Sequence, residues 1–363
     1  MTEKQTKNIK KILIRTGVIL ATVILFLLIT LYSVLLILTK GPSPTAKRLF
    51  VLSVKETSAG GFLADICLSK DEIDLILSGD GNDVSNEEMD MSLIKLPGNN
   101  GDTGIPGGNS SNQGNNGGND SSDGPGENNG GETVDPSDGI EVVDVVGSTY
   151  NGKMLIISDP SRVFVGVPDA YGEGCYGLSV KAMIEKYGAV AGTNAGGFHD
   201  PNGTGTGGIP EGIVIYKGEL LWGSAGASYS LAGLDANGIL HVGNMTGAEA
   251  MNRGIQYAAS YGPALVINGK PTGATLGGGL NPRTVIGQRA DGAILLLVIN
   301  GRSIDSLGAT LDDLVEIMLS YGAVNASNLD GGSSSIMMKD GEFLTESAYI
   351  FGERVVATAI LVK

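Results

Sequence analysis

An unbroken apolar run near the N-terminus, residues 17–38, restricts the fold of this chain more than any other feature of its sequence. The run has no charged side chain, and at about 1.5 Å per helical residue it can cross the roughly 30 Å hydrocarbon core of a bilayer. A helix at the surface of a soluble core would instead keep one polar face. We therefore expect residues 17–38 to form a transmembrane anchor.

The charges that flank this run predict its orientation. In the short segment before it, the acidic residue Glu3 stands against the basic residues Lys4, Lys7, Lys10, Lys11 and Arg15. Such an excess favours a cytoplasmic location for residues 1–16. The alternative is a cleaved signal peptide, but its apolar stretch is usually about 7–15 residues long and ends at a small-residue cleavage site. We therefore expect a single-pass protein of the cell membrane with an extracellular C-terminal domain.

The chain is acidic, with 24 basic and 39 acidic residues and a formal net charge of −15. This balance argues against nucleic acid as a partner. An acidic surface suits solvation near a cell wall and leaves room for a divalent cation, although no ligand set for a metal is predicted. Cys67 and Cys175 are too few for a disulfide framework. A bridge between them and two unpaired thiols both stay open.

Composition divides the part after the anchor into three regions. Residues 39–96 are expected to form a juxtamembrane stalk, in which RLFVLSVKETS and KDEIDLILS have helical spacing but are each too short to make a core. They could form helices or pack with a second copy. Residues 97–139 are rich in Gly, Asn, Ser and Asp, which predicts a disordered linker that acts as a flexible tether. Residues 140–363 are long enough for one folded domain.

The pattern within this domain predicts an α+β fold. Short β-branched runs between Gly, Asn and Asp turns predict strands at MLIIS, RVFVGV, GIVIY, ALVING, AILLLVING and VVATAILV. Two segments have helical spacing instead. Residues 178–187 have Ser179 as a candidate N-cap and stop at Gly188, and residues 310–321 begin with a capping box that includes Asp313. We expect a mixed or antiparallel sheet that carries these two main helices.

Both predicted helices lead through Tyr-Gly-Ala-Val and a short strand into a polar loop with adjacent glycines, so we expect two strand ends to face a common site. Paired glycines let a ligand approach the backbone, and the surrounding amides and hydroxyls can bind an anion. The candidate binding residues of the second loop are Asn328, Gly331, Gly332, Ser333 and Ser334. Asp330 is the candidate acid, base or metal ligand. The alternative is a tight turn in which Asp330 bonds to its own backbone.

The first loop offers groups that suit a sugar. The amide of Asn194 can both donate to and accept from sugar hydroxyls, and Phe198 could stack on a sugar face. Gly196 and Gly197 would let the ligand come close to the backbone. His199 is a secondary catalytic candidate, because a lone histidine is more often structural.

Two arginines at strand starts are candidate phosphate ligands. Arg283 follows the glycine-rich segment at 275–279, and Arg354 precedes the C-terminal strand. A guanidinium can hold a phosphate with two parallel hydrogen bonds, although a surface ion pair is the commoner role. Residues 200–205, DPNGTG, loosely resemble a calcium loop but lack its bidentate glutamate, so a plain turn is expected. The sequence has no Walker, Rossmann, nucleophile-elbow or zinc pattern.

Several ordered motifs together resemble the phosphodiester glycosidase family. The matching segments are NAGGF at 194–198, YGPALVING at 261–269, NPRTVIGQRADGAILLLVINGR at 281–302, NASNLDGGSSS at 325–335 and ERVVATAILV at 353–362. The resemblance covers about residues 141–363. It implies cleavage of a sugar-1-phosphodiester at the anomeric carbon. It further implies Asp330 as the principal catalytic or metal-binding carboxylate, Asn194 as the sugar-positioning amide, and Arg283 with Arg354 as phosphate clamps.

Two departures from the family pattern affect the substrate fit. Phe198-His199 stands where the family usually has two aromatic residues, and Ser333 stands where a third glycine often follows the aspartate. No second catalytic acid is identified, so neither retention nor inversion is predicted. We expect an extracytoplasmic hydrolase acting on cell-wall or capsular glycan that carries sugar-1-phosphate. The alternatives are a noncatalytic module that binds anionic glycopolymers and a factor in exopolysaccharide assembly.

Overall fold

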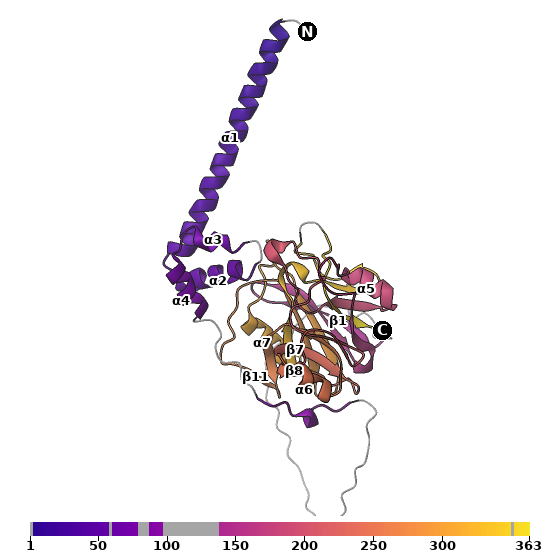
Figure 1. Ribbon diagram of the computed structural model, residues 1–363. Helices are drawn as coiled ribbons and strands as arrows, with labels where there is room; N and C mark the ends of the chain where they lie inside the picture. Colours follow the sequence, from indigo (N-terminus) through magenta and orange to yellow (C-terminus); the bar gives the residue numbers. More distant parts are fainter. Residues whose placement is uncertain (1–2, 58–59, 79–86, 97–137, 350–351) are drawn as a thin grey trace, which may run out of the picture.

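The computed structural model describes residues 3–57, 60–78, 87–96, 138–349 and 352–363. Helix α1 (Glu3–Lys40) projects away from the rest of the chain (Figure 1). Its stretch Lys10–Lys40 is long and apolar enough to cross a membrane by length and composition, and most of its large apolar side chains are exposed. The helix predicted over residues 17–38 is therefore present, while its orientation stays a prediction. The predicted linker, apart from residues 138–139, lies outside the described residues.

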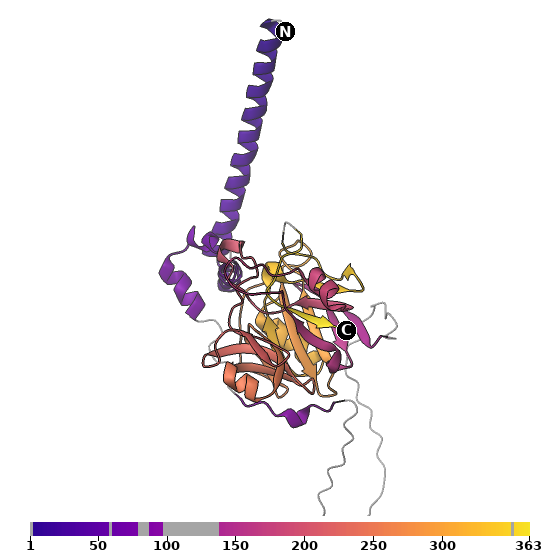
Figure 2. The same ribbon diagram turned by 45° about the vertical axis from the view of Figure 1, so that its right-hand side comes forward.

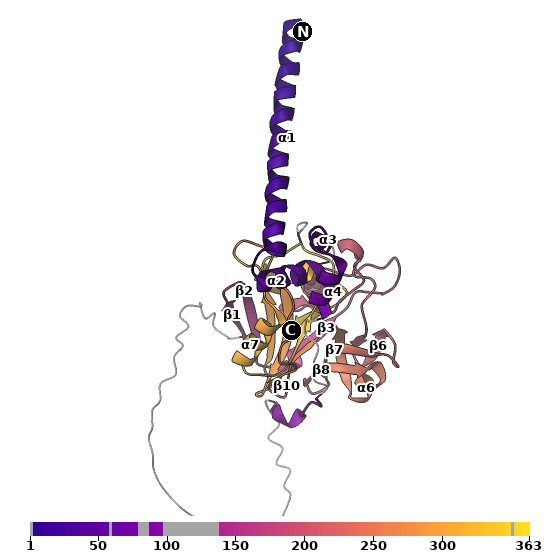
Figure 3. The ribbon, with the colours of Figure 1, turned by 90° about the vertical axis from the view of Figure 1, so that its left-hand side faces the viewer.

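Three short helices follow α1 and form a small packed unit. They are α2 (Pro44–Lys55), α3 (Phe62–Asp65) and α4 (Lys70–Ser78). Val51, Ala64, Leu68 and Ile73 make its apolar cluster. Figures 1 and 3 show α2 between the lower end of α1 and the large domain. The two stalk segments with helical spacing therefore form helices, α2 and α4.

A second stalk segment, residues 87–96, runs along the domain on the side away from α1 (Figure 2). It contains the one-turn helix η1 (Met91–Leu93). The backbone N–H of Asp90 donates to Asn268 Oδ1 over 2.7 Å, and the N–H of Lys95 donates to the carbonyl of Ala290 over 2.7 Å. The stalk thus contacts the domain at two separate places.

The largest sheet of the domain has seven strands, and its paired neighbours are antiparallel. In spatial order they are β1 (Ile140–Val146), β2 (Asn151–Ile157), β13 (Ile294–Ile299), β12 (Arg283–Arg289), β14 (Ala323–Leu329), β10 (Ala264–Ile267) and β11 (Lys270–Pro271). Strand β13 is an unbroken apolar run because both its faces are covered. Ile294, Leu296 and Val298 join the central core, while Leu295 and Leu297 face the other way.

Two smaller antiparallel sheets complete the domain. The first contains β16 (Glu342–Phe343), β15 (Met337–Lys339), β4 (Ala191–Asn194), β17 (Ala359–Val362) and β3 (Val163–Gly166). The second contains β6 (Glu219–Trp222), β5 (Val214–Tyr216), β9 (Ile255–Ser260), β7 (Ser228–Asp235) and β8 (Leu240–Thr246). One central apolar core draws residues from all three sheets. The sheets therefore pack around a shared interior rather than forming separate units.

Helices cover the outer faces of the three sheets. Helix α7 (Leu311–Ser320) packs on the seven-stranded sheet, α5 (Val180–Tyr187) packs on the sheet of β4 and β17, and α6 (Gly247–Asn252) packs beside β8 and β9. Each cluster buries one side of an amphipathic helix against a sheet face. The prediction of an α+β fold with antiparallel sheet and two main helices, α5 and α7, is confirmed.

The ends of the two main helices follow the predicted cap chemistry. Ser179 Oγ accepts from the N–H of Ala182 at the start of α5, and Gly188 ends that helix in the left-handed region at φ 60°. At α7, Thr310 and Asp313 form the reciprocal capping box. The polar loops that follow both helices are therefore held at fixed positions.

The thiols of Cys67 and Cys175 are free and half-buried.

Candidate active site

The ends of strands β4 and β14 lie side by side although they belong to different sheets. The backbone N–H of Asp330 donates to the carbonyl of Ala195 over 2.8 Å. Asn194 Nδ2 donates to the carbonyl of Asp330 over 2.6 Å. The two glycine-rich loops therefore meet, as the repeated helix-strand-loop pattern predicted.

Asn194 connects the ends of β4 and β14 through hydrogen bonds of its side-chain amide. It is fully buried, and its Oδ1 accepts from Thr284 Oγ1 over 2.9 Å and from the N–H of Ile336 over 3.2 Å. Every polar atom of the amide is thus bonded within the protein, as buried polar groups generally are. Asn194 positions the backbone of Asp330 and does not line the cavity where a sugar would bind.

A cavity of about 1020 Å³ opens above the two loops. Its lining includes the predicted residues Gly197, Phe198, Arg283, Asn328, Asp330, Gly331, Gly332, Ser333, Ser334 and Arg354. Residues far apart in the sequence therefore converge on one hollow, and this volume can hold a ligand of several sugar or phosphate groups.

Four carboxyl side chains line this cavity, those of Glu56, Asp200, Glu211 and Asp330, and Asp330 is the one whose pKa is raised. Burial raises the pKa of its side chain to about 7, and the nearby charge of Glu211 acts in the same direction. The hydroxyl of Ser334, the charge of Arg354 and the N–H of Gly331 oppose this rise. A carboxyl that titrates near neutral pH can exchange protons during a reaction, which is typical of catalytic groups.

Arg354 crosses the mouth of the first loop. Its Nη1 donates to Ser333 Oγ over 3.0 Å, its Nη2 pairs with Asp200 Oδ1, and its guanidinium lies 4.8 Å from the ring centre of Phe198. The stacked ring and the carboxylate fix the orientation of the guanidinium. Asp200 also accepts from the N–H of Gly205 over 2.7 Å, so residues 200–205 form a turn that serves Arg354.

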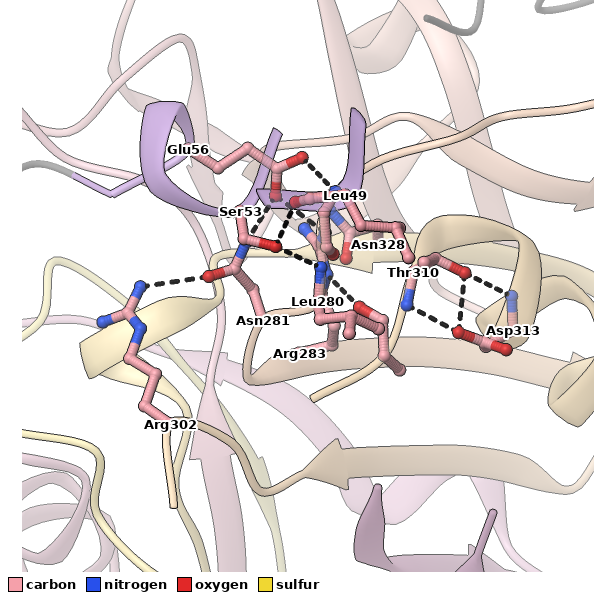
Figure 4. A network of polar contacts seen from close by, with 12 residues as sticks. Leu49, Ser53, Glu56, Leu280, Asn281, Arg283, Arg302, Thr310, Asp313 and Asn328 are labelled. Carbon is pink, nitrogen blue, oxygen red and sulfur yellow. Dashed lines mark hydrogen bonds and ion pairs between the residues drawn. The ribbon is translucent and has the colours of Figure 1, made fainter. Parts of the chain in front are cut away.

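Arg283 is hydrogen-bonded both to backbone carbonyls of the domain and to a carboxylate of the stalk. Its Nε donates to the carbonyl of Ala309 over 3.0 Å, and its Nη2 donates to the carbonyl of Gly279 and to Glu56 Oε2, each over 2.7 Å. Figure 4 shows that Glu56 comes from α2, outside the domain. The predicted phosphate ligand is therefore engaged by an internal carboxylate.

Asn328 offers an unused acceptor. Its Nδ2 donates to the carbonyl of Gly262 over 2.7 Å, while its Oδ1 is buried and accepts no hydrogen bond from the described part of the chain. A buried oxygen without a donor is unfavourable, and this residue lines the cavity. A sugar hydroxyl could satisfy it.

Besides Asn194, two predicted residues lie outside the cavity lining. Gly196 is buried in the packing of β4, where its N–H donates to Thr358 Oγ1 over 2.8 Å. His199 is exposed, and its backbone N–H donates to the carbonyl of Ile209 over 2.8 Å. The structure thus does not bring the histidine to the carboxyl of Asp330.

Other cavity residues were missed by the sequence reasoning. Arg302 Nη2 donates to Asn281 Oδ1 over 3.3 Å and lies against the backbone of Gly332. Glu211 lies against Gly197, where an added Cβ would come within 3.0 Å of Glu211 Oε2. Arg302 ends the INGR segment of the family resemblance, which was the one available signal. No motif in the sequence around Glu211 indicated that this residue belongs to the site.

A metal ligand set was left open by the sequence. Among the described residues, no group of three or more His, Cys, Asp and Glu side chains lies together so as to hold a metal ion. The charged groups that share the cavity with Asp330 are the guanidinium groups of Arg283, Arg302 and Arg354 and the carboxyl groups of Glu56, Asp200 and Glu211. Arginine stays protonated at any physiological pH, so the cavity has fixed positive charge.

Comparison with known proteins supports the resemblance seen in the sequence. Residues 187–363 match the family model described as phosphodiester glycosidase. A Bacillus subtilis (strain 168) protein, the SPbeta prophage-derived uncharacterized protein YomE, is 31% identical over 172 residues, which are 46% of this chain and 27% of that protein. This chain therefore spans about a quarter of the length of that relative. The family resemblance is confirmed for the C-terminal half of the chain.

Comparison with solved structures finds similar chains at lower identity. One is the catalytic domain of zebrafish N-acetylglucosamine-1-phosphodiester alpha-N-acetylglucosaminidase, auto-inhibited by its pro-peptide, at 20% identity and a TM-score of 0.50. The match covers 61% of this chain and 81% of the zebrafish chain. A hypothetical protein from Synechocystis is 18% identical with a TM-score of 0.45, over 64% of this chain and 63% of its own.

Proposed function

Because residues 187–363 form a phosphodiester glycosidase domain, we propose that this chain hydrolyses sugar-1-phosphodiesters in glycans at the outer surface of the membrane. The observation that carries this proposal is a cavity in which Asp330, whose pKa is raised to about 7, shares the lining with three guanidinium groups, while Glu56 and Asp200 pair with two of these arginines. Such a cavity matches a substrate that has both a phosphate charge and an anomeric carbon.

The three arginines divide the work of binding the phosphate. Arg302 and Arg354 flank Gly332 and Ser333, whose backbone and hydroxyl can donate to phosphate oxygens. Arg283 lies further along the same wall. Fixed positive charge stabilises the negative charge that develops on the leaving phosphate when the glycosidic bond breaks.

Asp330 acts in its ionised form at the anomeric carbon, directly or through a water molecule. The C1–O bond breaks and its electron pair goes to the phosphate oxygen, while an oxygen from water becomes bonded to C1. The water's protons are shared between the new sugar hydroxyl and Asp330, which releases its proton to solvent. A phosphate leaves as a stable anion and so needs little protonation, and the one carboxylate can stabilise the positive charge on the sugar.

One further residue suits the sugar half of the substrate. Asn328 offers a hydroxyl its amide oxygen, which accepts no hydrogen bond within the described residues. Phe198 is almost fully buried beneath the guanidinium of Arg354 and supports that arginine. Asn194 supports Asp330 through the backbone and is a positioning residue. His199 is exposed and has no part in this scheme.

The membrane location follows from α1. A helix able to span a bilayer precedes the domain, and the basic residues before it favour a cytoplasmic N-terminus. The domain would then face cell-wall or capsular glycan that carries sugar-1-phosphate.

A direct assay tests this function. The full chain in detergent micelles is incubated with a panel of sugar-1-phosphodiesters, and released sugar and phosphomonoester are both quantified, beside Asp330→Asn and the surface control Asp291→Asn. We expect turnover by the wild type and the control and a loss of at least about a hundredfold in Asp330→Asn, as for removal of a proton-transfer group. Binding without product would instead assign a glycopolymer-binding module, and equal turnover in all three proteins would remove Asp330 from the mechanism.

A further inference from the structure

The end of helix α2 reaches into the cavity, although α2 belongs to the stalk. Glu56 and Thr57 both line it. Glu56 Oε2 accepts from Arg283 Nη2 over 2.7 Å and from Asn281 Nδ2 over 2.8 Å, and Glu56 Oε1 accepts from the N–H of Gly279 over 2.8 Å (Figure 4). One carboxylate therefore receives three donors from the domain.

The backbone of α2 is fitted to the same loop. Ser53 Oγ accepts from the N–H of Leu280 over 2.9 Å, and a Cβ at Gly279 would clash with the backbone of Ser53. Only glycine at 279 lets the helix come this close. Val51 and Leu52 on the helix are buried. The contact is thus a shaped docking surface and not a single ion pair.

The donors around Glu56 suit a tetrahedral anion as well as a carboxylate. A guanidinium, a side-chain amide and a backbone N–H all converge on it, and each can donate to a phosphate oxygen. Arg283 has only 9% of its side chain exposed, so this positive charge is shielded from bulk solvent, whereas Glu56 keeps 32% exposed. A charge-assisted pair in this setting is stronger than one on an open surface.

We propose that α2 regulates the site by self-competition: Glu56 occupies an anion subsite made by Gly279, Asn281 and Arg283, and a phosphorylated glycan must displace it. The inference rests on the function proposed above, because the displacing ligand is the substrate's phosphate. With Glu56 in place, Arg283 is unavailable to substrate, while Arg302 and Arg354 line the same cavity.

Glu56 stays close to the anion subsite because ion pairs hold α2 against α3 and α4. Lys47 pairs with Glu72 of α4 over 3.0 Å, and Lys55 pairs with Asp65 of α3 over 2.9 Å. Glu56 therefore stays at a high effective concentration beside the subsite. Substrate binding releases the end of α2 from residues 279–280.

Phosphate binding to the full chain in detergent micelles tests the proposal without any need for turnover. Inorganic phosphate is titrated into wild type, Glu56→Ala and the matched control Asp74→Asn, an exposed acid of α4, at constant ionic strength. We expect phosphate to bind Glu56→Ala roughly tenfold more tightly than wild type, since hydrogen bonds to a charged group must otherwise be broken first. The control, which removes an acid from the same helical unit, should bind as wild type does. Equal affinity in all three proteins would overturn the proposal.

Amide hydrogen exchange of the wild type provides a second measurement that needs no variant. The N–H groups of Gly279 and Leu280 are protected by Glu56 and Ser53, so phosphate should speed exchange at Leu280 and along residues 51–56. Unchanged exchange at saturating phosphate would refute displacement. Hydrolysis of sugar-1-phosphodiesters is measured separately. If phosphate speeds exchange in α2 but no substrate is hydrolysed, the anion subsite stands and the proposed function is wrong. If wild type and Glu56→Ala hydrolyse substrate with equal kcat/KM, the function stands and the competition by Glu56 is wrong.

Discussion

The half-buried carboxyl of Asp330, at the wall of the cavity, should make the stability of the protein depend on pH in a direction opposite to that of an ordinary surface aspartate. Its pKa rises from 3.8 to about 7 in the folded protein, mainly through burial. Between about pH 4 and pH 7 the unfolded chain has lost this proton while the folded chain keeps it. The native state then binds more protons, so the free energy of unfolding falls as pH rises through this window. A difference of about 3 pH units corresponds to about 4 kcal/mol.

Asp330→Asn removes this titration while keeping the size of the side chain. We expect the unfolding free energy of wild type relative to the variant to drop by about 4 kcal/mol between pH 4 and pH 8, with most of the change below pH 7. Urea unfolding of both full chains in detergent, followed by near-ultraviolet circular dichroism of the domain, measures it. Asp291→Asn, at an exposed ion pair with Arg289, is the control and should run parallel to wild type. A wild-type curve parallel to that of Asp330→Asn over the whole range would refute the buried-acid interpretation.

Two further substitutions test how the cavity works. Glu211→Gln should lower the pKa of Asp330, because the charge of Glu211 raises it, and so move the acidic limb of the kcat/KM profile to lower pH; an unmoved limb would show that Glu211 does not act on Asp330. Arg302→Lys keeps the charge but loses the planar donor pair, so KM for a sugar-1-phosphodiester should rise roughly tenfold with a smaller change in kcat. Steady-state kinetics at two salt concentrations measure the latter, and an unchanged KM would place the phosphate elsewhere.

Local chemistry was enough to predict the helices and their loops. Helix α7 has its apolar residues on one face and a capping box at Thr310, so spacing alone defines it. After each of α5 and α7 the chain forms one short strand and then a polar loop at the end of that strand. Because this order is repeated, the sequence predicted that the loops of Asn194 and Asp330 lie close together. The packing of three sheets around one core was not predictable, because the partners of short strands are set by contacts distant in sequence.

The site residues that sequence reasoning misjudged or missed were decided by burial and long-range contact. Asn194 was predicted to bind sugar because an amide in a glycine-rich loop suits hydroxyls. In the fold its amide oxygen instead accepts hydrogen bonds from Thr284 and Ile336. Glu56 lies 227 residues from Arg283 along the chain, in a segment whose spacing indicated only a short helix. No local pattern could join these two residues.

The docking of residues 87–96 changes what the segment after them can do. Lys95 bonds to Ala290 of the domain just before that segment begins, and Asp138 pairs with Lys339 over 2.9 Å just after it ends. Both ends of residues 97–137 are therefore fastened to the same rigid body. The number of residues between these two attachment points therefore does not set the distance of the domain from α1. Because the entropic cost of closing a loop grows only slowly with its length, insertions in the glycine-rich region should be tolerated and should leave that distance unchanged.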